Sequence, residues 1–240
     1  MKSFVVENEH LTRQKEIIPM EVLNTPITVI GAGAVGSWVV LSLAKMGFHD
    51  ITVFDDDTIT IENMNCQFYP HDAIGQSKVA ALHRMVKQFA NVEIHALAHR
   101  FTGREQLTSI VISAVDSMTA RKLVWDSAKA NKAVTMFIDP RMGAEMALMY
   151  SMNPKDAKDI TSYEKTLYSD KEAVMERCTA KATIYTANLL AGLVVKAVKD
   201  AVLNAPRTRV AQWDIGKNQV QMYSSEAKPT PAKPKTKKKN

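Results

Sequence analysis

Apolar residues over the first 140 positions of the chain alternate between short continuous runs and helical spacing. The runs at 27–30 and 51–54 are rich in branched and aromatic residues, as is typical of buried strands. Within 77–89, by contrast, apolar residues recur every three or four positions, as on one face of a helix. The pattern predicts strands over 26–30, 50–55, 92–97, 109–115 and 133–138, and helices over 34–47, 77–89 and 118–131. This alternation favours a mostly parallel sheet with helices on both faces.

The pattern changes in the second half of the chain. We expect a strand over 143–152, an apolar helix over 179–203 and two strands within 207–223, and we place these strands in an antiparallel C-terminal extension of the sheet. Between the first strand and the helix lies a polar crossover loop, 153–178. A loop of this length with little structure of its own is uncommon unless it is functional.

These patterns divide the chain into three parts. Residues 1–24 form an N-terminal arm, 25–224 form the main domain, and 225–240 form a tail rich in lysine and proline. The tail holds six lysines and one glutamate, which accounts for most of the net charge of +6. Because such a segment cannot bury enough apolar surface to fold, we expect it to be disordered. Contact of the tail with nucleic acid is the less favoured alternative.

Composition excludes several classes of protein. No apolar run approaches the roughly 20 residues that span a bilayer, and the acidic N-terminal residues do not resemble a secretory signal. The two cysteines, Cys66 and Cys178, are too few for a disulfide framework or a four-cysteine zinc site. We therefore expect a cytoplasmic protein with no membrane association and no structural zinc.

The first predicted strand runs directly into a G-x-G-x-x-G turn that opens a helix. Gly31 allows the sharp turn, Gly33 allows the backbone to approach a phosphate, and Gly36 allows the helix and strand to pack closely. Amide groups at the start of the helix then favour an anion. At the end of the second strand stands Asp55, at the position of a carboxylate that binds ribose. The sequence therefore predicts a Rossmann-like domain that binds a nucleotide.

The glycine motif alone does not decide between an NAD(P)-dependent oxidoreductase and a site for ATP. Polar residues behind the second strand favour ATP, because a site that handles a triphosphate must stabilise charge on phosphate oxygens. The residues concerned are Asp57, Asn63, Gln67 and Lys78. Asp57 is placed in the nucleotide site, with capping of its loop as the alternative.

This series resembles the ThiF/MoeB/HesA family, the bacterial relatives of ubiquitin-activating enzymes. That family has a D-x-D-x-(V/I) strand end, an N-L-x-R-Q element and a G-x-x-K element, and 55–59, 63–67 and 75–78 match them in order. Asp116 matches the family's next acidic position, and the segment around Arg13 looks like the family's R-Q-I-x-L-P arm.

The resemblance implies an ATP-dependent adenylyltransferase that activates the C-terminal carboxylate of a small ubiquitin-like carrier protein or a peptide, and works as a homodimer. By position, Asp55 would bind ribose, Asn63 and Gln67 would line the nucleotide site, and Lys78 would contact the phosphates. Asp116 would bind Mg²⁺, and Arg13 would act as an arginine finger, which in the family often reaches the partner subunit's site.

Two positions depart from or extend this pattern. Cys66 stands where the family has arginine, which removes one phosphate-binding charge; Arg141 is a candidate replacement. Cys178 follows the crossover loop and is either a nucleophile that forms a thioester or a small residue of the core. A catalytically weakened scaffold of the same fold is the alternative function, and an NAD(P)-dependent oxidoreductase is the third hypothesis.

Overall fold

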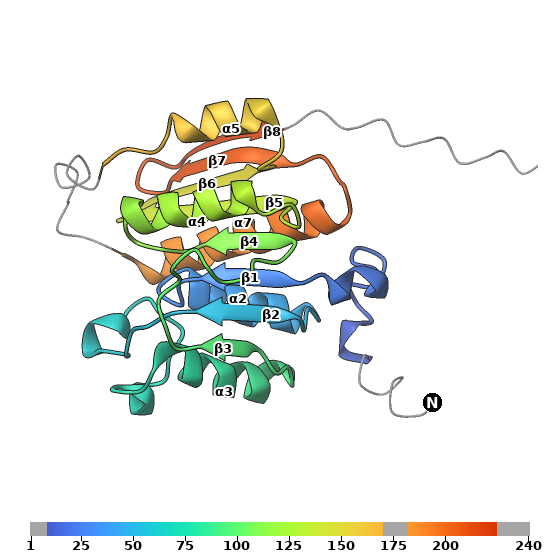
Figure 1. Ribbon diagram of the computed structural model, residues 1–240. Helices are drawn as coiled ribbons and strands as arrows, with labels where there is room; N and C mark the ends of the chain where they lie inside the picture. The colour runs from blue at the N-terminus through green and yellow to red at the C-terminus, as the bar shows by residue number, and fades with distance from the viewer. Residues whose placement is uncertain (1–8, 170–181, 225–240) are drawn as a thin grey trace, which may run out of the picture.

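The computed structural model describes residues 9–169 and 182–224, in which eight strands form one sheet in the order β3-β2-β1-β4-β5-β6-β7-β8 (Figure 1). The strands are β1 (Ile27–Ile30), β2 (Ile51–Phe54), β3 (His95–Leu97), β4 (Ile110–Ser113), β5 (Met136–Gly143), β6 (Met146–Met152), β7 (Thr208–Asp214) and β8 (Gln219–Ser224). The strands from β3 to β5 pair in parallel, and β5 to β8 pair antiparallel. The predicted fold class, a Rossmann-like sheet with an antiparallel C-terminal extension, is confirmed.

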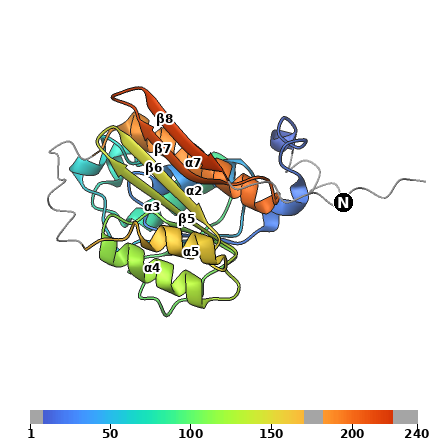
Figure 2. The same ribbon diagram turned by 90° about the horizontal axis from the view of Figure 1, so that it is seen from above.

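Helices cover both faces of the sheet, as the alternating pattern predicts (Figure 2). They are α2 (Gly36–Lys45), α3 (Lys78–Ala90), α4 (Met118–Ala130), α5 (Ala157–Glu164) and α7 (Ile184–Val202), with short 3-10 turns η1 (Glu9–Leu11), η2 (Met20–Asn24), η3 (Ile61–Asn63) and η4 (His71–Ala73). One core lies between the sheet and α2, α3 and α7, and a second lies between the sheet and α4 and α5. The apolar runs of the parallel strands are buried because they face both cores.

Two predictions about the second half are wrong in detail. The predicted crossover loop is not without structure, since α5 forms at 157–164, with Asp156 accepting bonds from the backbone N–H groups of Lys158 and Asp159 at its start. The strand predicted to end at 138 extends to Gly143, because β5 continues to pair with β6 after its pairing with β4 has ended. The rest of the crossover, 170–178, lies outside the described residues, as does the tail.

The N-terminal segment packs at the end of α2 that lies away from the glycine turn. Leu11 and Leu23 are buried there against Gly47, and the side-chain amide of Gln14 donates to the carbonyl of Met46 at 2.6 Å. In Figure 1 this segment lies at the opposite end of the sheet from the carboxyl ends of the parallel strands. Within the described residues, no helix has the length and hydropathy to cross a membrane.

Candidate functional site

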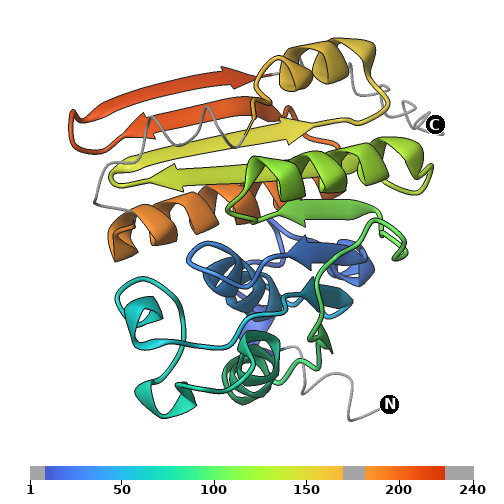
Figure 3. The ribbon, with the colours of Figure 1, turned by 60° about the vertical axis from the view of Figure 1, so that its left-hand side comes forward.

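A pocket of about 930 Å³ lies at the carboxyl ends of the parallel strands. Its lining comes mainly from the segments after β1, β2, β3 and β4, from the second half of β5 and from the start of α3. Figure 3 shows the arrows of β4 and β5 pointing to the same side of the sheet. The strand order changes direction at β1, which has β2 on one side and β4 on the other. Ligands of open α/β sheets bind at such a switch point.

The glycine turn after β1 forms one side of this pocket. Gly31 has a φ of +97°, and a β-carbon there would lie 2.4 Å from the carbonyl oxygen of Ala114. A β-carbon on Gly36 would lie 1.9 Å from the carbonyl oxygen of Gly31, so neither position accepts a side chain. Gly33 differs, because a β-carbon there meets nothing within 4 Å and the residue lines the pocket. The turn therefore leaves open space beside the backbone at Gly33.

Asp55 joins the end of β2 to the glycine turn. Its carboxylate accepts from the backbone N–H of Ala32 at 2.6 Å and from that of Asp57 at 2.9 Å. Burial raises the pKa of Asp55 above its ordinary value, although both backbone hydrogen bonds and the nearby ammonium of Lys78 act in the opposite direction. The carboxylate is thus held in one orientation at the edge of the pocket.

Lys78 is the first residue of α3 and its side chain is only 8% exposed. Its Nζ lies 2.7 Å from Oδ2 of Asp57, which is itself largely exposed. The backbone supports this pair, since the N–H of Lys78 donates to the carbonyl of Asp57 at 3.0 Å. A buried lysine with one exposed acidic partner can exchange that partner for another anion that enters the pocket.

The segment between β2 and α3 docks on the start of α2. The hydroxyl of Tyr69 donates to the carbonyl of Ala32 at 2.6 Å, and burial together with the charge of Asp55 raises the pKa of this tyrosine well above its ordinary value. Asn63 uses its side-chain oxygen to accept from the N–H of Thr60 at 3.0 Å. The Oε1 of Gln67 is buried and has no hydrogen-bond partner among the described residues. An unpaired buried oxygen in a pocket lining is consistent with a polar ligand.

Cys66, at the position where an arginine is expected, is buried within the same segment. Its carbonyl accepts from the indole N–H of Trp38 at 2.9 Å, and burial raises the pKa of its thiol. The side chain is therefore a neutral thiol and supplies no positive charge. Arg100, which the sequence analysis missed, is a cation of the pocket lining, paired with Asp56 at 3.1 Å. No motif marks Arg100, because it follows a short strand and lies in an irregular loop.

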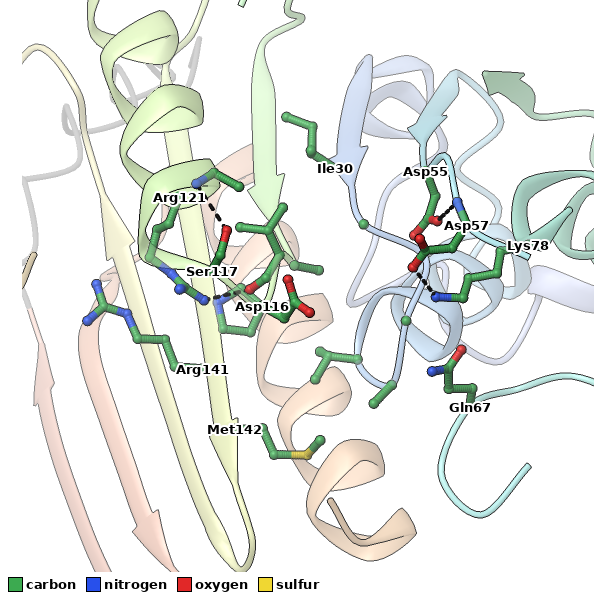
Figure 4. A pocket seen from close by; sticks show the side chains of 18 of the residues that line it. Ile30, Asp55, Asp57, Gln67, Lys78, Asp116, Ser117, Arg121, Arg141 and Met142 are labelled. Carbon is green, nitrogen blue, oxygen red and sulfur yellow. Dashed lines mark hydrogen bonds and ion pairs between the residues drawn. The ribbon is translucent and has the colours of Figure 1, made fainter. Parts of the chain in front are cut away.

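The opposite side of the pocket carries Asp116, which is exposed and precedes α4. Ser117 caps this helix by accepting from the N–H of Ala120 at 3.2 Å. Figure 4 shows Asp116 across the pocket from Asp57 and Lys78. A lysine and a carboxylate thus face the same space from two sides.

Behind Asp116 lies a buried ionic cluster around Asp139, which is fully buried in the middle of β5. Its carboxylate accepts from Nε of Arg121 at 2.7 Å, from Nε of Arg141 at 2.8 Å and from the hydroxyl of Tyr163 at 2.8 Å. The two other nitrogens of the Arg141 guanidinium donate to Thr166 at 2.9 Å each. Figure 4 shows this guanidinium turned away from Asp55 and Lys78. The candidate replacement for the missing arginine is therefore engaged within its own side of the pocket.

The structure brings most of the sequence-predicted residues together. The pocket lining includes Gly31, Gly33, Asp55, Asp57, Asn63, Gln67, Lys78 and Asp116. Gly36 lies beneath the turn and serves packing. Arg13 is exposed in the N-terminal segment and does not line the pocket of its own chain. Cys178 lies outside the described residues.

The residues of the pocket suit a nucleotide with a divalent cation. Open space beside Gly33 leaves room for a phosphate near the backbone, and the unpaired oxygen of Gln67 can accept from a nucleoside. Lys78 provides a positive charge for phosphate oxygens, and the exposed carboxylate of Asp116 is a hard oxygen ligand of the kind that Mg²⁺ prefers.

Comparison with known proteins agrees with this geometry. The sequence profile of the ThiF family matches residues 19–236. The catalytic subunit of the NEDD8-activating enzyme E1 of Caenorhabditis elegans is 36% identical over 107 residues, which cover 42% of this chain and 25% of that protein. The SUMO-activating enzyme subunit uba-2 of the same organism is 34% identical over 112 residues, covering 43% of this chain and 19% of that protein. The chain thus spans about a quarter or less of these curated relatives.

Solved structures show the same fold at lower identity. A structure of PaaA superposes with a TM-score of 0.73 at 16% identity, covering 91% of this chain and 73% of that one. A structure of Escherichia coli MccB with ATP superposes with a TM-score of 0.70 at 14% identity, covering 94% of this chain and 73% of that one.

Proposed function

We propose an ATP-dependent adenylation reaction for this protein, because the chain belongs to the ThiF family and its pocket places a buried lysine and an exposed carboxylate around a glycine turn. The curated relatives are activating enzymes for NEDD8 and SUMO, and the MccB structure contains ATP. These names support ATP as one substrate and a small protein as the other. Another MccB structure is a complex with N-formylated MccA, which keeps a peptide among the candidates.

The residues of the pocket have separate roles in holding ATP. The fixed carboxylate of Asp55 accepts from the ribose hydroxyls, and Gln67 and Asn63 line the nucleoside side. Lys78 exchanges Asp57 for phosphate oxygens, while the open backbone at Gly33 admits the phosphates. Asp116 would hold Mg²⁺, which when bound would supply positive charge for the phosphates.

The reaction is a substitution at the α-phosphate. A carboxylate oxygen of the substrate forms a bond to the α-phosphorus, the bond from that phosphorus to the bridging oxygen breaks, and pyrophosphate leaves with the electron pair. Lys78 stabilises the charge that develops on the phosphate oxygens, and the glycine turn and Asp55 hold the nucleotide in line with the carboxylate. Positioning and electrostatic stabilisation supply most of the acceleration in such a site.

The substrate in this proposal is the C-terminal carboxylate of a small ubiquitin-like carrier or of a peptide, in the cytoplasm. The N-terminal segment that carries Arg13 packs at the far end of α2 from the glycine turn. Arg13 therefore acts as an arginine finger only if it enters the pocket of a second copy, and we propose a homodimer for this reason. A thioester on Cys178 after adenylation remains part of the proposal.

One observation carries the proposal: Lys78 is buried in the pocket lining, has the exposed Asp57 as its acidic partner and faces Asp116. The test is ATP–pyrophosphate exchange with small candidate carriers that end in Gly-Gly. We expect exchange with the wild type and at least about a 100-fold loss in Lys78→Ala, the size expected when one preorganised charge is removed.

Lys87→Ala is the matched control, because Lys87 lies on the same helix but pairs with Glu93 at the surface. It should leave exchange unchanged. Exchange that persists in Lys78→Ala with every active carrier would overturn the assignment of the phosphate site.

A further inference from the structure

The Asp139 cluster contains a continuous chain of hydrogen bonds that ends at the backbone next to Asp116. Asp139 is fully buried, and a buried carboxylate is tolerated only when its charge and its hydrogen bonds are satisfied. The Nε of Arg121 donates to it at 2.7 Å, and the guanidinium of Arg121 is held in place by this bond. The NH2 group of Arg121 then donates to the carbonyl oxygen of Val115 at 2.8 Å.

Val115 directly precedes Asp116. Because the Asp116 side chain is exposed, its position in the pocket depends on the backbone that carries it. The Val115 carbonyl and the Ser117 cap fix this backbone from both sides. Arg121 lines the pocket one turn into α4, but it is only 4% exposed, and its guanidinium is engaged by Asp139 and by the carbonyl of Val115.

We propose that Asp139 is a positioning residue for the metal-binding carboxylate of Asp116, acting through Arg121 and the carbonyl of Val115. The inference rests on the proposed function, since it assigns Mg²⁺·ATP to the pocket. Outer residues that orient a metal ligand commonly affect metal affinity about 10- to 100-fold when they are replaced. Asp139 would therefore affect the part of ATP binding that depends on Mg²⁺.

The chain offers a matched comparison in Asp159. This residue is 2% exposed and, like Asp139, pairs with two arginines, Arg207 and Arg209. It also accepts from the backbone N–H of Asn153 at 2.8 Å. Asp159 does not line the pocket, nor does either of its arginines. A merely structural role for a buried aspartate should give the same result at both positions.

The experiment is calorimetric titration of the full chain with ATP, once with Mg²⁺ and once with EDTA. The quantity compared is the dissociation constant for ATP in EDTA divided by the dissociation constant for ATP in Mg²⁺. The melting temperature of the ligand-free protein is measured alongside. We expect Asp139→Asn to lower this ratio about tenfold. Asp159→Asn should lower the melting temperature and leave the ratio at the wild-type value.

A second set of variants tests whether Asp139 acts through Arg121 and the carbonyl of Val115. Arg121→Lys keeps a positive charge beside Asp139 but cannot also reach Val115, so it should lower the ratio as Asp139→Asn does. In Asp116→Asn, adding Asp139→Asn should cause no further change in the ratio if Asp139 acts through Asp116.

The outcomes separate the two proposals. If the wild type binds ATP with a dependence on Mg²⁺ and both Asp139→Asn and Arg121→Lys keep the wild-type ratio, the positioning role is overturned and the nucleotide site stands. The positioning role is also overturned, and the nucleotide site stands, if Asp139→Asn lowers the ratio by the same factor in Asp116→Asn as in the wild type. If the wild type binds no ATP with Mg²⁺, the proposed function fails, and the positioning role fails with it. Should Asp139→Asn not fold, Arg121→Lys alone decides.

Discussion

The two sides of the pocket are built in different ways. The first, which we call the glycine wall, comprises Gly31, Gly33, Asp55 and Lys78. The second, the arginine wall, comprises Asp116, Arg121, Asp139 and Arg141. The glycine wall presents its cation to the pocket with one exposed partner, whereas the arginine wall uses both of its guanidinium groups internally.

This difference indicates that the two walls have different roles. A wall with an exchangeable ion pair and open backbone is suited to bind a ligand directly, while a wall whose charges are already satisfied is suited to hold its exposed carboxylate in place. Substitutions in the glycine wall, except at Gly31, should therefore affect ligand binding and leave the fold unchanged. Substitutions inside the arginine wall should affect stability first.

The largest effect should come from Gly36→Ala. Its β-carbon would lie 1.9 Å from the carbonyl oxygen of Gly31, so the turn or α2 must move. We expect a loss of about 3 kcal/mol or more in the free energy of unfolding, measured by urea denaturation. Gly33→Ala is the matched variant, and because it meets nothing within 4 Å it should keep stability within about 1 kcal/mol while weakening ATP binding. Equal stability losses in the two variants would contradict this account of the turn.

Tyr163→Phe should have a smaller effect, limited to stability. The hydroxyl donates to the buried carboxylate of Asp139 at 2.8 Å, and both burial and this carboxylate raise the pKa of Tyr163 so that it stays a donor. Loss of a hydrogen bond to a charged group costs about 1.5–3 kcal/mol. Thermal or urea unfolding measures the loss, and ATP affinity with Mg²⁺ should be unchanged because Arg121 keeps its bond to Val115. A variant as stable as the wild type would show that the hydroxyl does not support the cluster.

The smallest effect should come from Asp55→Asn, which should change how the stability of the protein depends on pH. Burial raises the pKa of Asp55 in the folded protein above the ordinary 3.8, so the folded state takes up this proton more readily than the unfolded state. Wild-type stability should therefore fall relative to Asp55→Asn as the pH rises from about 3.8 through the raised pKa, and the difference should be constant above it. Urea unfolding at a series of pH values measures this. A difference that grows in favour of the wild type as the pH rises would mean that the pKa is lowered instead.

The glycine wall could be predicted from the sequence because its determinants are local. The turn, the carboxylate at the strand end and the lysine at a helix start are each defined by residues close in the sequence, and 31–78 contains all of them. The parallel strands were predictable for a similar reason, since continuous apolar runs mark strands buried on both faces.

Asp116 and Arg141 of the arginine wall were candidates from the sequence, but the contacts within this wall could not be predicted, because they join residues far apart in the chain. Asp139 contacts Arg121 and Tyr163, which lie 18 and 24 positions away. The helix that carries Tyr163 was missed because only one face of a short polar segment is buried, and the single sequence sign was the N-cap at Asp156. β5 was ended too early because Pro140 interrupts the apolar run, although it lies beyond the part of the strand that pairs with β4.

The most direct test of the account is titration of the wild-type protein with ATP and Mg²⁺, in parallel with NADH. We expect ATP to bind more tightly than NADH, and Lys78→Met, which keeps the buried stem but removes the charge, to weaken ATP binding at least about tenfold. Tighter binding of NADH, together with ATP affinity that is indifferent to the charge at position 78, would contradict the assignment of a triphosphate to this pocket.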